Sequence, residues 1–124
     1  MSKSVLVVDD DKILSFLTVN AFKKSEKIDG IEVAYNGQEA MSFLENSEEH
    51  PDFILLDISM PVMDGFEFLE QYYLKNLNRK SKIAIYTSSI EEADKEKAKQ
   101  YEDVIDFIVK PLSNEKLEEV IAAL

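Results

Sequence analysis

FILLDISMPVMDG, residues 53–65, joins four consecutive apolar side chains to an aspartate and then to a turn containing proline and glycine. A short apolar run bounded by turn residues is typical of a strand that is buried on both faces. A second run, Val-Leu-Val-Val at residues 5–8, is also followed by aspartate. Both runs are therefore predicted to be central strands that each deliver an acidic side chain at the carboxyl end.

Three further strands are predicted at residues 31–35, 82–87 and 104–109, the first of them beginning just past an Asp29-Gly30 turn signal. Apolar residues at helical spacing predict helices at residues 11–24, 37–45, 64–77, 91–102 and 113–124. Strand and helix thus alternate along the chain. This alternation predicts an α/β fold, a doubly wound five-stranded parallel sheet with helices on both faces.

Two of these helices carry predictions about packing. The first should bury Leu14, Leu17 and Ala21, which share one helical face. Segment 91–102 is rich in charge and poor in apolar residues, so it should pack lightly and move at low energetic cost.

The length of 124 residues, with 45% apolar and 31% charged side chains, predicts one globular domain over residues 1–124. A formal net charge of −11 opposes binding to nucleic acid or to an anionic membrane, since both interactions depend on lysine and arginine. Cysteine is absent and no long apolar run occurs. Together these features favour a cytoplasmic protein that does not insert into a membrane.

Five polar side chains are expected to meet at the carboxyl edge of the predicted sheet. Asp9 and Asp10 follow the first strand, Asp57 ends the third, Thr87 the fourth, and Lys110 the fifth. Ligands of open α/β sheets bind at this edge. Clustered carboxylates repel one another and need a cation, and a donor set of oxygen atoms favours Mg²⁺ over Zn²⁺.

An ionised aspartate can also accept a phosphoryl group covalently, and such transfers depend mainly on positioning and charge neutralisation. Asp57 would be the acceptor, with Mg²⁺ and Lys110 neutralising charge. The Thr87 hydroxyl could then hydrogen-bond a phosphoryl oxygen.

The segments VLVVDDD (5–11), LLDISMPVMDG (55–65), YTS (86–88) and VKP (109–111) resemble, in order and spacing, the CheY-like receiver domains of response regulators. The resemblance covers the whole chain. It implies a flavodoxin-like strand order 2-1-3-4-5, for which CheY is itself a standard example.

The resemblance also implies roles for individual residues. Asp57 would be the phosphoacceptor, and Asp10, Asp57 and the backbone carbonyl of Ser59 would ligate Mg²⁺, with Asp9 assisting through water. Lys110 would contact the phosphoryl group, and the peptide bond between Lys110 and Pro111 would be cis, which directs the lysine amine into the site.

Further implications concern switching and partners. Phe107 occupies the position of the family's switch aromatic, which turns inward when Thr87 moves toward the phosphoryl group; an ordinary core phenylalanine is the alternative.

The donor would be a sensor histidine kinase or a histidine phosphotransfer protein. The output would be an unidentified downstream protein or a self-dimer through helix 91–102, strand 104–109 and the last helix. The domain would be no enzyme beyond catalysing its own phosphorylation and dephosphorylation, at a rate that Ser59 and Ser89 tune.

Three other functions compete. In a haloacid-dehalogenase-type phosphohydrolase Asp9 would be the nucleophile, but no acidic pair closely follows Lys110 and no space remains for a cap domain. A binding module independent of phosphorylation would have no need for the complete set of pocket residues. Flavin binding lacks a phosphate-binding loop after the first strand.

Overall fold

Five parallel strands form one sheet, as the alternation of strands and helices predicted, and their order is β2-β1-β3-β4-β5, as the resemblance implied. The computed structural model describes residues 2–78 and 80–124. The strands are β1 (Lys3–Val8), β2 (Ile28–Ala34), β3 (Phe53–Asp57), β4 (Lys82–Thr87) and β5 (Val104–Val109). The helices are α1 (Lys12–Lys23), α2 (Gly37–Asn46), α3 (Gly65–Leu74), α4 (Glu92–Ala98) and α5 (Asn114–Ala123).

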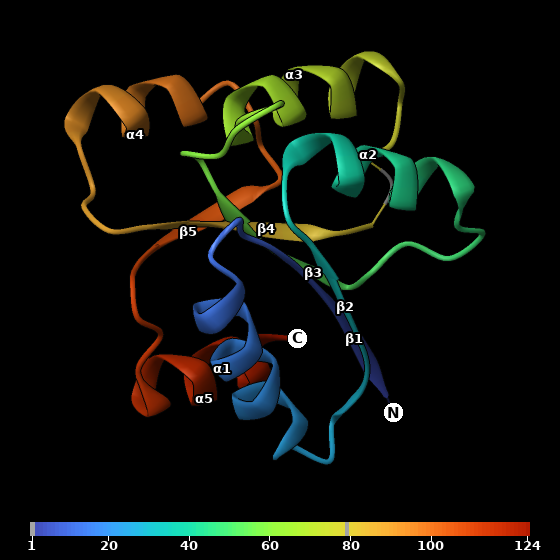
Figure 1. The fold of residues 1–124 in the computed structure, drawn as a ribbon, viewed down its shortest axis with the longest axis vertical. Coiled ribbons are helices and arrows are strands. Elements are labelled where there is room, and N and C mark those ends of the chain that lie inside the picture. The colour runs from blue at the N-terminus through green and yellow to red at the C-terminus, as the bar shows by residue number, and fades with distance from the viewer. Residues whose placement is uncertain (1, 79) are drawn as a thin grey trace.

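The helices cover the sheet in two layers. Helices α1 and α5 lie on one face, and α2, α3 and α4 lie on the other (Figure 1). Strand β3 is buried along its whole length. Its side chains alternate between the layers: Ile54 and Leu56 join the core under α2 and α3, whereas Phe53 and Leu55 join the core under α1 and α5. Burying one large apolar side chain of this kind contributes about 1.5–3 kcal/mol to the stability of the fold.

The predicted turn at Asp29-Gly30 is wrong, because both residues lie within β2. Gly30 pairs with Ser4 of β1, and the register of this pairing shifts between Lys3 and Ser4. Pairing with the central strand β1 therefore overrides the turn signal.

The predicted buried face of α1 is wrong at Leu17, whereas Leu14 and Ala21 are half-buried and pack against the core under α1 and α5. Its buried residues are Ser15, Thr18 and Phe22, whereas Leu17 is 57% exposed. The buried hydroxyls do not need water, because Ser15 donates to the carbonyl of Asp9 at 3.3 Å and Thr18 donates to that of Leu14 at 2.9 Å. Satisfied hydroxyls can be buried at little cost, which leaves the larger apolar side chains outside.

Helix α3 begins and ends at side-chain and backbone caps. Asp64 accepts from the backbone N–H of Glu67, and the Glu67 side chain accepts from that of Asp64, which forms a capping box. The helix stops at Leu74, short of the predicted residue 77. Asn76 is left-handed with φ of 56°, and the N–H of Leu77 donates to the Tyr72 carbonyl, as in a Schellman motif.

Helix α4 is shorter than predicted and lightly packed. Ala98 is its one buried residue, and Glu91 makes no side-chain capping hydrogen bond. The chain that follows is held by Tyr101, whose ring lies 5.3 Å from that of Tyr73, and by the Asp103 N–H, which donates to the Tyr73 hydroxyl. The anchorage of this segment is therefore stronger after α4 than at its start.

Among all the helices of the described residues, none is long and apolar enough to cross a membrane.

Candidate functional site

Three carboxylates meet where β1 and β3 end. The strands pair in parallel with Val8 opposite Leu56, so Asp9 and Asp57 emerge side by side. Oxygen atoms of Asp9, Asp10 and Asp57 all lie within 4.8 Å of one another. Asp9 and Asp57 are buried and Asp10 is exposed, so the cluster opens to solvent on one side.

Lys110 bridges the two buried carboxylates. Its Nζ lies 2.9 Å from Oδ2 of Asp57 and 3.0 Å from Oδ2 of Asp9. Both contacts are ion pairs, and the contact with Asp57 is also a hydrogen bond. The backbone N–H of Lys110 donates to the Thr87 carbonyl, and the Lys110–Pro111 peptide is cis, as the resemblance implied.

The pKa values of Asp57 and Lys110 both differ from their ordinary values. Burial raises the pKa of Asp57, and the Ser59 N–H and Lys110 only partly offset that rise. Burial by itself would lower the pKa of Lys110, but its contacts with the carboxylates of Asp57 and Asp9 outweigh that effect and raise the pKa. The two pKa values therefore rise for different reasons: loss of hydration for the Asp57 carboxyl, and neighbouring negative charge for the Lys110 ammonium.

The loop after β3 is held against the acceptor strand. The backbone N–H of Ser59 donates to Oδ1 of Asp57 at 3.0 Å. Gly65 begins α3 so close to this loop that an added Cβ would lie 2.5 Å from the Asp57 carbonyl oxygen and 2.7 Å from Cα of Ile58. Glycine is therefore required here by space, because its φ is not positive.

Thr87 and Phe107 lie on the two strands at the β5 edge of the sheet. Thr87 is buried at the end of β4 and lines the same cavity as Asp57 and Lys110. Its hydroxyl donates to the Ser89 carbonyl at 3.1 Å. Phe107 of β5 pairs with Ile85 of β4 and is half-buried against the core under α2 and α3.

The cavity above these residues has a volume of about 540 Å³. It includes Asp10, Asp57, Ser59, Thr87 and Lys110 in its lining, so the predicted residues other than the buried Asp9 and Phe107 face one space.

Glu91 and Asp94, just before and inside the first turn of α4, also line this cavity. Neither was predicted from the sequence, since their only signal was membership in a charged helix.

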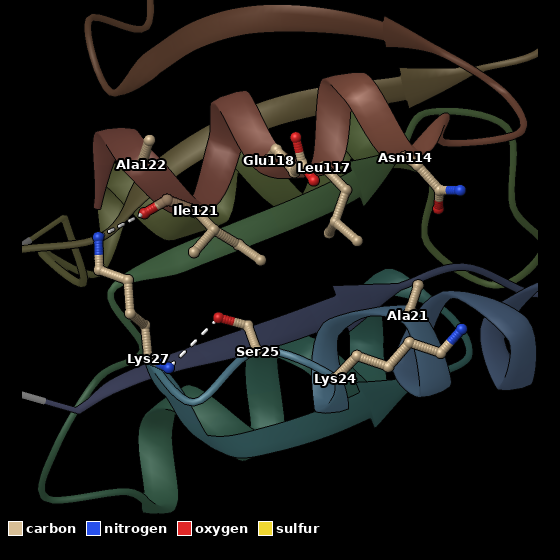
Figure 2. A pocket seen from close by; sticks show the side chains of 9 residues that line it. All are labelled: Ala21, Lys24, Ser25, Lys27, Asn114, Leu117, Glu118, Ile121 and Ala122. Atoms are coloured by element: carbon tan, nitrogen blue, oxygen red, sulfur yellow. Dashed lines mark hydrogen bonds between the residues drawn. The ribbon is translucent and has the colours of Figure 1, made fainter.

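A second cavity, of about 550 Å³, lies between the carboxyl half of α1 and α5 (Figure 2). Leu117 and Ile121 supply apolar surface, and Lys27 donates to the Ile121 carbonyl at 3.3 Å across one end. It contains none of the predicted site residues.

The fold is that of an α/β domain with a doubly wound parallel sheet and a carboxylate–lysine cluster at the carboxyl edge of the strands. Comparison with known proteins supplies its family. The chain belongs to the response regulator receiver domain family, whose sequence model matches residues 5–122. It is a CheY-like domain of two-component signalling, and receiver domains interact with histidine kinases.

Individual relatives agree with this membership. The chain is 33% identical over 88 residues to the sensor histidine kinase CheAY of Helicobacter pylori, covering 71% of this chain and 11% of that protein. A two component response regulator from Cytophaga hutchinsonii is similar in structure, with a TM-score of 0.85, 25% identity and 100% coverage of both chains. The phosphorylated cyanobacterial phytochrome response regulator RcpA gives a TM-score of 0.78 at 27% identity, covering 99% of this chain and 91% of the other. The chain spans less than a third of the length of the curated relatives it matches.

Proposed function

We propose that the chain is a phosphoacceptor domain in which Asp57 receives a phosphoryl group from a partner's phosphohistidine. The observation that carries this proposal is the position of Lys110 Nζ, which lies within 3.0 Å of both buried carboxylates, Asp57 and Asp9. Such a cation is poorly placed to stabilise the fold by itself, since burying an ion pair is costly. It is well placed to balance charge on a phosphoryl group attached to Asp57.

The same carboxylates are suited to hold Mg²⁺. They offer oxygen ligands alone, on one side open to water through the exposed Asp10. Asp10, Asp57 and the Ser59 carbonyl would hold the ion, and Asp9 would assist through water. Bound there, Mg²⁺ would neutralise charge on the phosphoryl oxygens during transfer.

In the transfer itself, a carboxylate oxygen of Asp57 attacks phosphorus while the bond from phosphorus to the histidine nitrogen breaks. The electron pair of that bond stays on the imidazole nitrogen, which takes up a proton from water. Lys110 stabilises the charge on the phosphoryl oxygens, and the Ser59 N–H orients the attacking carboxylate. Hydrolysis later returns Asp57 and inorganic phosphate, at a rate to which Ser59 and Ser89 contribute from the cavity lining.

The donor is a second protein. The chain has one histidine, His50, and that residue is buried in the loop before β3. A sensor histidine kinase or a histidine phosphotransfer protein fits this requirement. Both would meet the domain in the cytoplasm, and neither nucleic acid nor membrane has a part in this function.

The output is a change at the α4–β5–α5 surface. Strand β5 is the edge of the sheet, and its Ile105 and Val109 are 55% and 49% exposed. When Thr87 turns to the phosphoryl group it leaves Ser89, which frees the loop into α4, and Phe107 moves into the space left behind. A downstream protein or a second copy of the domain then binds the altered surface.

Intact-protein mass spectrometry tests the acceptor. Incubation with phosphoramidate and Mg²⁺ should add one phosphoryl group to the wild type and to an Asp29→Asn control, which changes an exposed carboxylate of β2. Asp57→Asn should add none, and chelation of Mg²⁺ should abolish labelling of the wild type. Labelling of Asp57→Asn to the wild-type extent would refute the assignment.

A further inference from the structure

The acidic side chains of α4 fall into two groups. On the outer side, Glu92 pairs with Lys95 at 3.6 Å and Glu96 with Lys99 at 2.8 Å, so each carboxylate has a lysine beside it. Glu91 and Asp94 differ, because they line the phosphoacceptor cavity, and within the described part of the chain neither forms an ion pair. The unpaired negative charge of this helix thus faces the site.

The cavity that these two carboxylates line has no unpaired cationic side chain among its described lining residues. Lys110 is the only lysine among its lining residues, and Asp57 and Asp9 already engage its Nζ. With Mg²⁺ bound, the ion and Lys110 together balance the three clustered carboxylates. Asp11, Glu91 and Asp94, which also line the cavity, remain uncompensated, so an incoming anion meets net negative charge there.

We propose that Glu91 and Asp94 are specificity-determining residues, which select against free anionic phosphodonors and for a protein donor that carries lysine or arginine beside its phosphohistidine. The inference rests on the proposed function of Asp57. A free donor brings only its own negative charge past these carboxylates. A protein donor with adjacent cations offsets the same repulsion by pairing with them.

The expected size of the effect follows from the dimensions of the site. Charges across a cavity of about 540 Å³ are separated by about 8–10 Å, and at that distance each carboxylate should slow a dianionic donor about twofold to fivefold at low salt. The repulsion energy between each carboxylate and the donor is proportional to the net charge of the donor. A donor with one net negative charge should therefore show the square root of the factor seen with a dianion.

Phosphorylation rates with two free donors test this dependence. Acetyl phosphate is a dianion at neutral pH, whereas phosphoramidate carries one net negative charge. Rates would be followed by intact mass at saturating Mg²⁺ for the wild type, for Glu91→Gln combined with Asp94→Asn, and for the matched outer pair Glu92→Gln combined with Glu96→Gln. The cavity double variant should gain about tenfold with acetyl phosphate and about threefold with phosphoramidate, and the outer pair should change either rate by less than about twofold.

Salt gives a readout that needs no variant. The wild-type rate with acetyl phosphate should rise more steeply with ionic strength than the rate with phosphoramidate, and the advantage of the cavity variant should vanish near 1 M salt, where the Debye length is about 3 Å. Equal effects of the cavity and outer pairs, or equal effects on both donors, would overturn the selectivity while leaving Asp57 as acceptor. Failure of every variant to be labelled by either donor at any salt would overturn the proposed function and this inference together.

A phosphohistidine peptide tests the other half of the proposal. A synthetic peptide with lysines flanking the phosphohistidine should transfer faster to the wild type than the same peptide with alanines. Neutralising Glu91 and Asp94 should reduce that preference severalfold. An unchanged preference in the cavity variant would overturn the pairing with donor cations.

Discussion

The hydroxyl of Thr87 donates its hydrogen bond to the carbonyl oxygen of Ser89, two residues farther along the loop into α4. A hydroxyl has one proton to donate, so Thr87 can hydrogen-bond a phosphoryl oxygen as a donor only by releasing Ser89. The loop and the phosphoryl group therefore compete for the same donor. This competition links the acceptor to the most lightly packed helix of the domain.

Thr87→Val should separate binding of a phosphoryl group from the response to it. The variant keeps the shape of the side chain and loses the hydroxyl, so beryllofluoride should still bind at Asp57. Hydrogen exchange in wild type should change over residues 88–98 and 104–109 when beryllofluoride is added, and this change should be largely lost in the variant. Ser88→Ala, which removes a hydroxyl that is exposed, serves as the control. A full response in Thr87→Val would contradict the link.

Asp57→Asn should stabilise the metal-free domain by about 1–2 kcal/mol at neutral pH, because it removes one of two buried charges from a cluster of three mutually repelling carboxylates. Burial raises the pKa of Asp57 above its unfolded value, so ionisation of Asp57 costs stability as pH rises through that interval. Below the unfolded pKa the carboxyl is protonated in both states and the cost is absent. The gain in melting temperature should thus be full at pH 7 and shrink toward pH 4. Mg²⁺ should stabilise the wild type and not the variant; a gain that is constant with pH would contradict the assignment.

Gly65→Ala should destabilise the domain by about 1–3 kcal/mol, since the added methyl group meets backbone atoms of Asp57 and Ile58 that cannot move independently of the site. Stabilisation by Mg²⁺ should fall with it, because α3 and the loop after β3 must shift. Gly30→Ala is the matched control, where the new Cβ meets only Cβ of Ser4 at 3.4 Å. Urea denaturation with and without Mg²⁺ measures both effects. Equal losses at the two glycines would argue against a steric requirement at Gly65.

Val62→Asn should stabilise the domain by about 1 kcal/mol. Val62 has φ of 69° and is 79% exposed, so a β-branched side chain occupies the left-handed region without burying its surface. Asparagine adopts this region more readily and already does so at Asn76. Val62→Ile, which keeps the branch, should give no gain in thermal denaturation. A loss of stability in Val62→Asn would indicate that the valine makes a contact worth more than its strain.

Much of the site could be predicted from the amino-acid sequence alone. Apolar runs followed by aspartate predicted β1 and β3, and the carboxyl ends of parallel strands necessarily meet at one edge. Asp9, Asp57, Thr87 and Lys110 were therefore placed together from strand periodicity, and the motif around residues 55–65 supplied the family. Ser113 as the cap of α5 was likewise predictable, because its side chain accepts from the Lys116 N–H within the same turn.

Other features depend on which surfaces come into contact in the folded domain, and these could not be predicted from local sequence. Helical spacing assigned Leu17 to the core, but the pairing of α1 with the sheet buried Ser15 and Thr18 instead, once backbone carbonyls satisfied their hydroxyls. Pairing with β1 likewise carried β2 through the Asp29-Gly30 turn signal. Local periodicity reports how a segment could present its faces, whereas the face that is buried depends on partners distant in the sequence. Glu91 and Asp94 show the same division, since only the folding of α4 over the ends of the strands turns two ordinary acidic residues into part of the phosphoacceptor cavity.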